Sequence, residues 1–408
     1  MAQSEPSPTT KVLIAGAGLS GLFLAQGLRK YNVDFQIFEQ DPTPDMRSQG
    51  YRIKIFPDGV ANMKYLLDDG IWQQFTETVA DTVMGESALN AIDASFISSR
   101  KLRGPVPFTV DRGVLRRTLL KGLEGKISWG KKYAHHTIEN DKVTVEFEDG
   151  TSEVGSLLVG ADGSRSRVRQ QMVPDYRVMD AEGICLYGRT ELTPELQSRI
   201  TPKVTKWLTL CRDIAGLIQQ IIFDSELPVT MFIEKMHFPH RDIHPELPED
   251  YMYFSMLLPS RLLGPTPELL AQALKAPPHE LGLQLSEEWD PSIRCLLELQ
   301  DPTAAAVLQV ATTTPDIPVW TPNEHVTLLG DSIHLMSPAG GVGAGTALMD
   351  AASLTKILTQ GPATAEKIGT YEAEMRKYAK VALERSFRGG KTIFGQPDFE
   401  NCKEVKME

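Results

Sequence analysis

A glycine-rich segment near the start of the chain has the residue types and the spacing to hold a pair of phosphates. Gly16, Gly18 and Gly21 follow the pattern GxGxxG, with Leu19 and Ser20 between them. In this pattern the first glycine permits a tight turn, the second lets the backbone approach a pyrophosphate, and the third allows a helix to pack closely on a strand. The helix that follows offers free N–H groups and a positive dipole end to an anion. The segment therefore predicts a dinucleotide site.

The elements around this segment must position it. The apolar run 12–15 is typical of a buried parallel strand, a helix is predicted over 19–31, and a second apolar strand over 35–38 ends at Glu39. A carboxylate at the end of the second strand of such a βαβ unit accepts hydrogen bonds from ribose hydroxyls. We therefore expect Glu39 and its neighbour Gln40 to bind the dinucleotide. The pattern does not distinguish FAD from NAD.

A second segment places an acidic residue between a strand and a basic helix start. The apolar residues 157–159 run into Gly160-Ala161-Asp162-Gly163, and arginines follow at 165, 167 and 169. Two interpretations stay open: Asp162 caps the N-terminus of the helix, or it contacts the cofactor.

A third segment combines an acid with a glycine-rich run. The predicted strand 326–329 leads into Gly330-Asp331-Ser332, and glycines at 340–345 precede a helix from Thr346. If the cofactor is a flavin, Asp331 can bind ribityl hydroxyls, and the helix start can face the N1–C2=O edge of the reduced ring. Such a helix end contributes about 0.3–1 kcal/mol when exposed and up to ~2 kcal/mol when partly buried. The residues that we expect to bind the cofactor here are Asp331, Pro338, Gly343, Ala344 and Gly345. For His334 a structural role is favoured over a catalytic one.

Taken in this order, the three segments resemble those of the flavoprotein monooxygenases whose best-known members hydroxylate phenols and salicylate, and their character is closest to fungal natural-product enzymes. The resemblance runs from Val12 to about Leu358. It implies an α/β fold in which a Rossmann-like FAD-binding domain with a parallel sheet carries an inserted antiparallel substrate domain and a C-terminal helix. The expected domains are 10–75, 100–178 and 315–360 for FAD binding, 76–99 and 179–314 for substrate binding, and 361–408 as the C-terminal helical segment.

The same resemblance assigns roles to individual residues. Glu39 would bind the adenosine ribose, Arg112 would contact the FAD, and Asp162 would be associated with both FAD and NAD(P)H. Asp331 would bind the ribityl chain, and residues 343–346 would surround the isoalloxazine ring. One departure is Gly-Ala-Gly-Thr at 343–346, where the family often has an asparagine after its glycine.

The activity that this resemblance implies is that of an FAD-dependent monooxygenase. NAD(P)H would reduce the flavin, O2 would add to it as a C4a-hydroperoxide, and one oxygen atom would hydroxylate or epoxidise a polycyclic or aromatic natural-product intermediate. The alternatives are an FAD-dependent dehydrogenase or a halogenase on the same fold, or a non-catalytic dinucleotide-binding module. The halogenase is disfavoured because none of the five tryptophans lies in a WxWxIP segment. The module is disfavoured because it would not need the second and third segments.

The middle of the chain predicts an antiparallel sheet that covers a pocket. Its β-type runs are 183–190, 204–211, 217–223, 229–234 and 251–258. Arg189 shares a face of the first run with Cys185 and Tyr187. It could stabilise an oxyanion that develops on the substrate, or steer a carbonyl or indole ring; the alternative is a solvated surface arginine. It is our one catalytic candidate because the fungal enzymes that this chain resembles place an arginine in a comparable strand.

Other stretches carry weaker expectations. Arg47, Arg52 and Lys54 either guard the flavin entrance or form a solvated edge. The pattern also predicts helices over 60–82 and 112–122, antiparallel strands within 127–160, and a closing helix over 364–387.

Composition and charge exclude several classes of function. The net charge of −11 argues against a nucleic-acid binder, which needs a basic face. No stretch approaches the roughly 20 apolar residues of a membrane span, so we expect a cytoplasmic protein. The four cysteines are far apart and form no Cys/His cluster, so no metal is expected. The expected partners are a hydrophobic or aromatic small molecule and O2, and the sequence does not indicate an oligomeric state.

Overall fold

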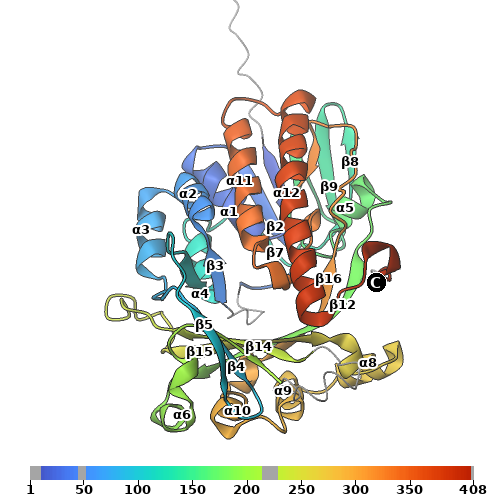
Figure 1. Ribbon diagram of the computed structural model, residues 1–408. Coiled ribbons are helices and arrows are strands. Elements are labelled where there is room, and N and C mark those ends of the chain that lie inside the picture. Colours follow the sequence, from blue (N-terminus) through green and yellow to red (C-terminus); the bar gives the residue numbers. More distant parts are fainter. Residues whose placement is uncertain (1–10, 45–51, 214–227, 406–408) are drawn as a thin grey trace, which may run out of the picture.

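Five parallel strands form the sheet that carries the glycine-rich segment. The computed structural model describes residues 11–44, 52–213 and 228–405, and the strand order of this sheet is β17-β11-β1-β2-β7 (Figure 1). Its strands are β1 (Val12–Ala15), β2 (Phe35–Glu39), β7 (Ile127–Trp129), β11 (Leu157–Gly160) and β17 (Val326–Leu328). β1, β11 and β17 are buried along their whole length, because other layers cover both faces of the sheet.

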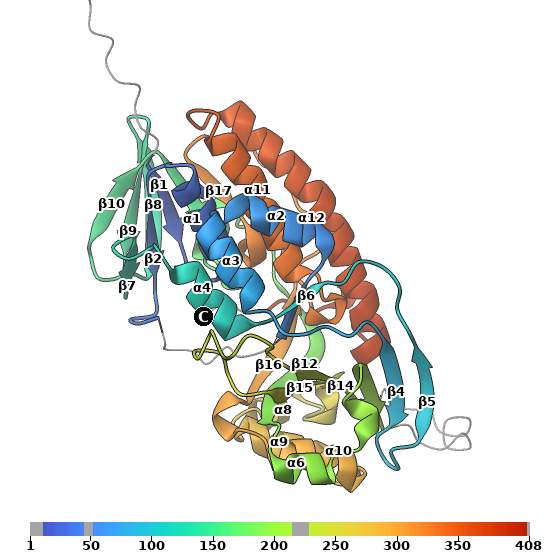
Figure 2. The same ribbon diagram turned by 90° about the vertical axis from the view of Figure 1, so that its left-hand side faces the viewer.

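The two covering layers differ in kind. Figure 2 shows a small antiparallel sheet on one side and helices on the other. The sheet consists of β8 (Tyr133–Glu139), β9 (Lys142–Phe147) and β10 (Ser152–Gly155), and the helices are α1 (Leu19–Lys30), α11 (Gly343–Leu358) and α12 (Ala365–Phe394). The antiparallel strands expected within 127–160 are thus confirmed for β8 to β10. The expectation is wrong for β7 and β11, which pair in parallel with β2 and β1.

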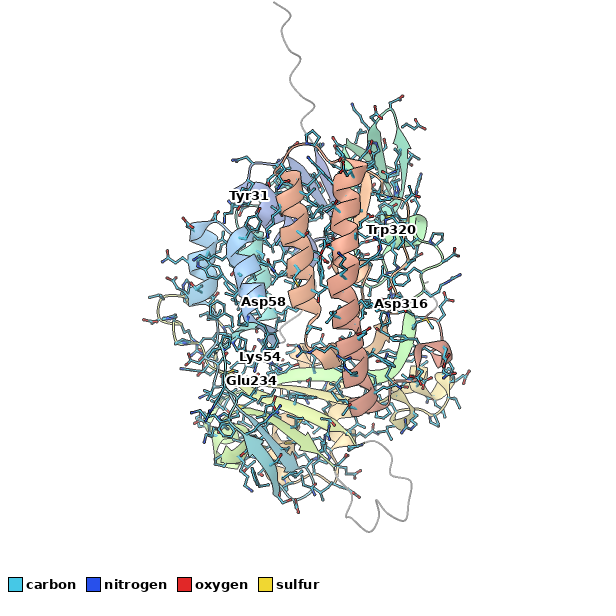
Figure 3. All side chains as sticks on the ribbon, turned by 45° about the horizontal axis from the view of Figure 1, so that its top comes forward. Tyr31, Lys54, Asp58, Glu234, Asp316 and Trp320 are labelled. Atoms are coloured by element: carbon cyan, nitrogen blue, oxygen red, sulfur yellow. The ribbon has the colours of Figure 1, made fainter. Side chains whose placement is uncertain are left out.

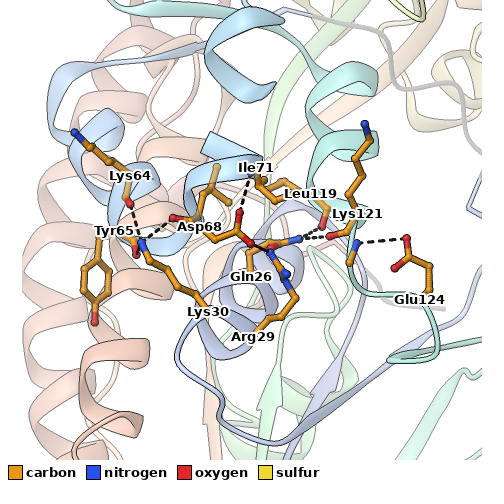
Figure 4. A network of polar contacts seen from close by, with 12 residues as sticks. Gln26, Arg29, Lys30, Lys64, Tyr65, Asp68, Ile71, Leu119, Lys121 and Glu124 are labelled. Atoms are coloured by element: carbon orange, nitrogen blue, oxygen red, sulfur yellow. Dashed lines mark hydrogen bonds and ion pairs between the residues drawn. The ribbon is translucent and has the colours of Figure 1, made fainter. Parts of the chain in front are cut away.

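Two helices replace the single helix predicted over 60–82. They are α2 (Pro57–Leu66) and α3 (Asp69–Glu77). Asp68 starts the second helix by accepting a hydrogen bond from the N–H of Ile71 at 2.9 Å. The ammonium of Lys30 in α1 stabilises the end of α2 by donating to the carbonyls of Lys64, Tyr65 and Leu67 (Figure 4).

A seven-stranded sheet forms the lower half of the molecule in Figure 1. In order, its strands are β16 (Ala306–Thr312), β12 (Met179–Glu191), β15 (Tyr251–Pro259), β14 (Thr230–Met236), β13 (Leu208–Arg212), β4 (Glu86–Asn90) and β5 (Phe96–Arg100). All neighbours pair antiparallel except β13 and β4. The inserted antiparallel sheet is therefore confirmed, with two strands from the stretch 76–99, although the run predicted at 217–223 lies outside the described residues. The division into three domains stays a prediction.

Alternate residues of this sheet face opposite sides. One face packs on the helices α6 (Pro194–Arg199), α8 (Pro267–Ala273), α9 (Pro278–Leu285) and α10 (Pro291–Glu298). Ile184 and Leu186 of β12 and Phe254 of β15 lie in that apolar core. The residues between them point toward the parallel sheet, so the strand period of two separates a core face from a face that is available to a ligand.

Three shorter elements lie between the two large sheets. Two of them are the strands β3 (Arg52–Ile55) and β6 (Phe108–Asp111), which pair antiparallel, and the third is the helix α4 (Arg112–Leu120). A further short helix, α5 (Arg167–Met172), follows β11 of the parallel sheet. The closing helix α12 continues past its predicted end, and its Ile393 and Phe394 pack against Ala181 and Leu257 of the seven-stranded sheet. Among the described residues, no helix is both long and apolar enough to cross a membrane.

Candidate active site

The three segments singled out in the sequence touch one another at one edge of the parallel sheet. A Cβ atom at Gly16 would lie 2.4 Å from the carbonyl oxygen of Ala161, and one at Gly330 would lie 2.2 Å from Oγ of Ser20. The N–H of Leu329 donates to the carbonyl of Gly160 at 3.0 Å. Glycine is required at both close approaches, and both glycines have a positive φ. The carboxyl ends of β1, β11 and β17 therefore form one continuous wall.

A cavity of about 1190 Å³ opens along this wall and reaches the seven-stranded sheet. It exceeds the ~300–1,000 Å³ that is usual for one small-molecule site, so it has room for more than a single small ligand. The predicted cofactor-binding residues that line it are Gly16, Gly18, Leu19, Ser20, Glu39, Gln40, Arg112, Asp162, Asp331, Pro338, Gly343 and Ala344. Gly21 and Gly345 do not line it.

The glycines of the first segment serve different purposes. A Cβ atom at Gly21 would lie 2.1 Å from the carbonyl oxygen of Gly16, so Gly21 lets α1 pack against the turn. A Cβ atom at Gly18 would meet no atom within 4 Å, and its φ of −70° suits any residue. Gly18 thus faces open cavity at the N-terminus of α1, where a phosphate could approach the backbone.

Glu39 holds the turn after β1 and keeps part of its capacity to accept hydrogen bonds. Its Oε2 accepts the N–H of Ala17 at 2.7 Å, and its Oε1 accepts the N–H of Asp41 at 3.0 Å. Each carboxylate oxygen accepts two hydrogen bonds, so one position on each remains for a ribose hydroxyl. The assignment of Glu39 to the ribose stays a prediction.

The carboxylate of Asp162 accepts hydrogen bonds from residues at the start of α5. Its Oδ1 accepts the hydroxyl of Ser166 at 2.5 Å, and its Oδ2 accepts the N–H groups of Arg167 at 2.8 Å and Val168 at 3.2 Å. Burial raises the pKa of this carboxyl, although these hydrogen bonds act in the opposite direction. The N-cap of α5 is Ser166, whose hydroxyl accepts the N–H of Arg169 at 2.9 Å, so Asp162 supports the helix start without being the N-cap that the first interpretation assumed. A contact with FAD or NAD(P)H stays a prediction.

Asp331 presents an open acceptor to the cavity. Its side chain is exposed to the cavity and makes no hydrogen bond to the protein across the described ranges. The preceding Gly330 lies against Ala347 in the first turns of α11. Burial raises the pKa of this carboxyl, and the positive charges of His334 and Arg112 partly counter the rise. His334 itself is fully buried, with its Nε2 2.6 Å from Asp350, which agrees with a structural role.

Arg189 is not among the residues that line the cavity. Its guanidinium lies over the ring of Tyr251 at 5.6 Å and 3.7 Å from Asp301. The Tyr251 hydroxyl donates to Asp111 at 2.7 Å, and Asp111 caps α4, whose first residue is Arg112. Arg189 thus contacts Tyr251 and Asp301 instead of the cavity, and its catalytic role stays a prediction that this geometry does not favour.

The seven-stranded sheet contributes residues to the cavity wall that the sequence analysis did not single out. Phe232, Tyr253, Ser255 and Leu257 line the cavity from β14 and β15, together with the expected Cys185 and Tyr187 of β12. Strand alternation was the available signal, because all of them lie opposite the core-facing residues. Of the basic residues near β3, Arg52 and Lys54 line the cavity, while Arg47 lies outside the described residues.

Comparison with known proteins identifies the family. The family model described as an FAD binding domain matches residues 9–195 and 320–386. The chain belongs to this FAD binding domain family. FAD is accordingly its cofactor, and the site fits it: Gly18 leaves open space at a helix N-terminus, and Asp331 offers an unused acceptor beside a second helix N-terminus.

Relatives of this FAD binding domain protein carry monooxygenase names. The chain is 41% identical over 425 residues to the dual O-methyltransferase/FAD-dependent monooxygenase CTB3 of Cercospora beticola, covering 99% of this chain and 48% of that protein. It is 28% identical to the FAD-dependent monooxygenase thnD of Trichoderma harzianum, covering 94% of both. A solved protein of Photorhabdus luminescens, provisionally described as an FAD-containing monooxygenase, superposes with a TM-score of 0.77 at 26% identity, covering 94% of this chain and 98% of that one. The chain spans about half the length of CTB3.

Proposed function

We propose that this flavoprotein is an FAD-dependent monooxygenase that uses NAD(P)H and O2 to hydroxylate or epoxidise an aromatic or polycyclic natural-product intermediate. The observation that carries the proposal is the single cavity: one wall has the residues suited to FAD, and the opposite wall is the aromatic and apolar face of the seven-stranded sheet. A cofactor and a substrate can therefore share one cavity. The monooxygenase names of CTB3 and thnD support the same reaction class.

The parallel-sheet side supplies binding and orientation. In this proposal Gly18 and the N-terminus of α1 hold the pyrophosphate, Glu39 and Gln40 hold the adenosine ribose, and Asp331 holds the ribityl chain. The N-terminus of α11 at Gly343 would direct its dipole toward the ring system. When bound, FAD takes up a hydride from NAD(P)H and activates O2 for insertion of one oxygen atom into the substrate.

The seven-stranded sheet excludes water and orients the substrate. Cys185, Phe232, Leu257 and Leu308 give this part of the cavity an apolar surface, and Tyr187 adds a second aromatic ring. Burial raises the pKa of the Cys185 thiol to about 12, so this residue stays neutral and acts as an apolar contact. A water-poor pocket limits hydrolysis and proton leakage during oxygen transfer.

The first experiment is the visible absorption spectrum of the purified chain before and after anaerobic NADPH, and then after air. We expect flavin bands that bleach and return, with O2 uptake coupled to NAD(P)H oxidation. A colourless protein that cannot be reconstituted with FAD would instead support the non-catalytic module.

A second experiment separates the monooxygenase from a dehydrogenase or halogenase on the same fold. Turnover under ¹⁸O2 should place one labelled atom in the product, with the second recovered in water. Product without label, formed at the same rate, would point to the dehydrogenase, or to the halogenase if the product carries a halogen atom.

A further inference from the structure

The strand pair β3 and β6 lies against the seven-stranded sheet. Nζ of Lys54 in β3 lies 2.8 Å from Oε1 of Glu234 in β14, and Figure 3 shows both side chains at this junction. A second contact across the junction involves Tyr251, the first residue of β15, whose hydroxyl donates to Oδ2 of Asp111 at 2.7 Å. Tyr251 and Asp111 are only 2% and 3% exposed. This buried hydrogen bond joins β15 to the strand that leads into α4.

Asp111 uses its two carboxylate oxygens for different contacts. Oδ1 accepts the N–H of Val114 at 2.9 Å, which makes Asp111 the N-cap of α4. A Cβ atom at Gly113 would lie 3.2 Å from the same oxygen, so the glycine leaves room for the carboxylate. Arg52 is the cross-strand neighbour of Asp111, and the two side chains share a face of the strand pair. The Tyr251 hydroxyl holds the other oxygen, Oδ2, from the side of the seven-stranded sheet.

Arg112 directly follows Asp111 and is the first residue of α4. It lines the large cavity, and its positive charge partly counters the rise in the pKa of Asp331, so the two side chains lie in the same part of the cavity. A helix begins where its cap fixes the backbone, so a shift of Asp111 is passed directly to Arg112. The position of Arg112 in the cavity therefore depends on what holds Asp111.

The ring of Tyr251 has little room to move. It belongs to a buried apolar cluster that contains Phe238, Leu247 and also Val114 of α4. The ring centres of Phe238 and Tyr251 are 6.1 Å apart. Burial raises the pKa of the Tyr251 hydroxyl well above the ordinary value of 10.0, and the charge of Asp111 adds to the rise, so the hydroxyl stays protonated and remains a donor. A well-fixed donor thus faces the cap of α4.

We propose that Tyr251 is a positioning residue for the cofactor site, because through Asp111 it holds Arg112 where FAD binds. Tyr251 is not among the described residues that line the cavity, so its effect on FAD has to pass through another residue. Tyr253 and Ser255 of the same strand do line the cavity. One strand therefore supplies part of the substrate wall and also sets the position of a cofactor contact. This role depends on FAD as the cofactor and on the predicted contact of Arg112 with it, and not on the proposed monooxygenase reaction.

The test is a double-mutant cycle on FAD affinity. Serial dilution of the FAD-loaded chain without NAD(P)H, followed by the fluorescence of the released flavin, gives the FAD dissociation constant. Arg112→Gln should raise this constant by about tenfold or more, and Tyr251→Phe, which removes the hydroxyl and keeps the ring, by about fivefold. In the Arg112→Gln background, Tyr251→Phe should change the constant by less than about twofold, because the residue through which it acts has been removed.

A second variant tests the same hydrogen bond from its other end. Asp111→Ser keeps a residue that caps α4 but is too short to accept from Tyr251, so the FAD dissociation constant should rise at least as much as in Tyr251→Phe. Tyr176→Phe is the matched control. The Tyr176 hydroxyl donates to the carbonyl of Thr314 at 2.8 Å, away from the residues that line the cavity, and its removal should leave the constant within about twofold of wild type.

A purely structural Tyr251 would make the effect of Tyr251→Phe equal in the wild-type and Arg112→Gln backgrounds, and that result would overturn the proposal. An unchanged FAD dissociation constant in Arg112→Gln, Tyr251→Phe or Asp111→Ser would overturn it as well. The dilution involves no turnover. Absence of NAD(P)H-dependent O2 uptake would therefore remove the monooxygenase assignment and leave a non-additive cycle standing as evidence for the positioning role.

Discussion

Nε2 of His334 lies 2.6 Å from Oδ2 of Asp350, and both side chains are completely buried. The same carboxylate accepts the N–H of Gly330 and the hydroxyl of Tyr378, each at 2.7 Å. Asp350 of α11 therefore connects two parts of the structure, the turn that contains Asp331 and the closing helix α12. This contact fixes the part of the cavity wall where we place the ribityl chain.

The His334–Asp350 pair predicts a pH-dependent stability. Burial alone would lower the pKa of His334, but the charge of Asp350 outweighs it and raises the pKa above the ordinary value of 6.5. The folded state then binds this proton more tightly than the unfolded state, so the contribution is complete below pH 6.5 and is lost as pH rises through the raised pKa. His334→Gln should therefore cost about 3 kcal/mol at low pH and less at high pH. Urea unfolding at saturating FAD across this range measures the difference; a difference that does not change with pH would contradict the assignment.

Asp331→Ala should reduce FAD retention without unfolding the chain. The carboxylate makes no hydrogen bond to the protein in the described ranges, and burial raises its pKa, so its removal should not destabilise the fold. The flavin-to-protein absorbance ratio of the purified variant should fall sharply, while its melting temperature without FAD stays at the wild-type value. Full flavin stoichiometry in the variant would show that this carboxylate does not bind the cofactor.

Alanine at Gly18 and at Gly21 should have opposite consequences. Gly18→Ala adds a methyl group to open cavity, so the apo chain should be as stable as wild type while its FAD dissociation constant rises by about tenfold or more. Gly21→Ala forces a methyl group against the carbonyl of Gly16 and should cost about 1–3 kcal/mol of folding stability. Thermal unfolding of both apo variants separates the two roles. Equal destabilisation of both would mean that Gly18 is also a packing residue.

Arg189→Gln tests the catalytic role that the sequence suggested. The side chain is about one third exposed in its contact with Asp301, so losing this pair should cost less than about 1 kcal/mol. Because Arg189 does not line the cavity, kcat should stay within about threefold of wild type. A fall of about a hundredfold in kcat with unchanged KM would restore the oxyanion-stabilising role. Arg199→Gln, in a second exposed ion pair beside α10, serves as the control.

The cofactor half of the site was largely predictable because its determinants are local. Each segment combines a short apolar strand, a glycine turn and a helix start, and parallel strands bring their carboxyl ends to one edge. Twelve of the fourteen predicted cofactor residues line the cavity. Eleven of them come from these segments and the strand that follows the first one, and Arg112 was predicted from the resemblance alone. Gly21 does not line the cavity, since its role is to allow close packing, and the side chain of Asp162 is used by its own helix start.

The substrate half was less predictable because it depends on contacts between distant segments. Lys54 and Glu234 are 180 positions apart, and no local pattern links β3 to β14. Strand alternation placed Arg189 on the correct face with Cys185 and Tyr187. Strand alternation could not indicate that the cavity ends before Arg189. How far the cavity extends along β12 depends on the elements that lie opposite this strand.

The inner strand β15 is buried on both faces, and its two faces serve different purposes. Met252, Phe254 and Met256 face the helices, whereas Tyr253 and Ser255 face the cavity. Substrate preference can thus drift or be engineered at every second position while the intervening residues continue to hold the sheet together. The same arrangement makes the strand intolerant of a one-residue insertion or deletion, which would exchange the two sets of side chains and lose pocket and core together.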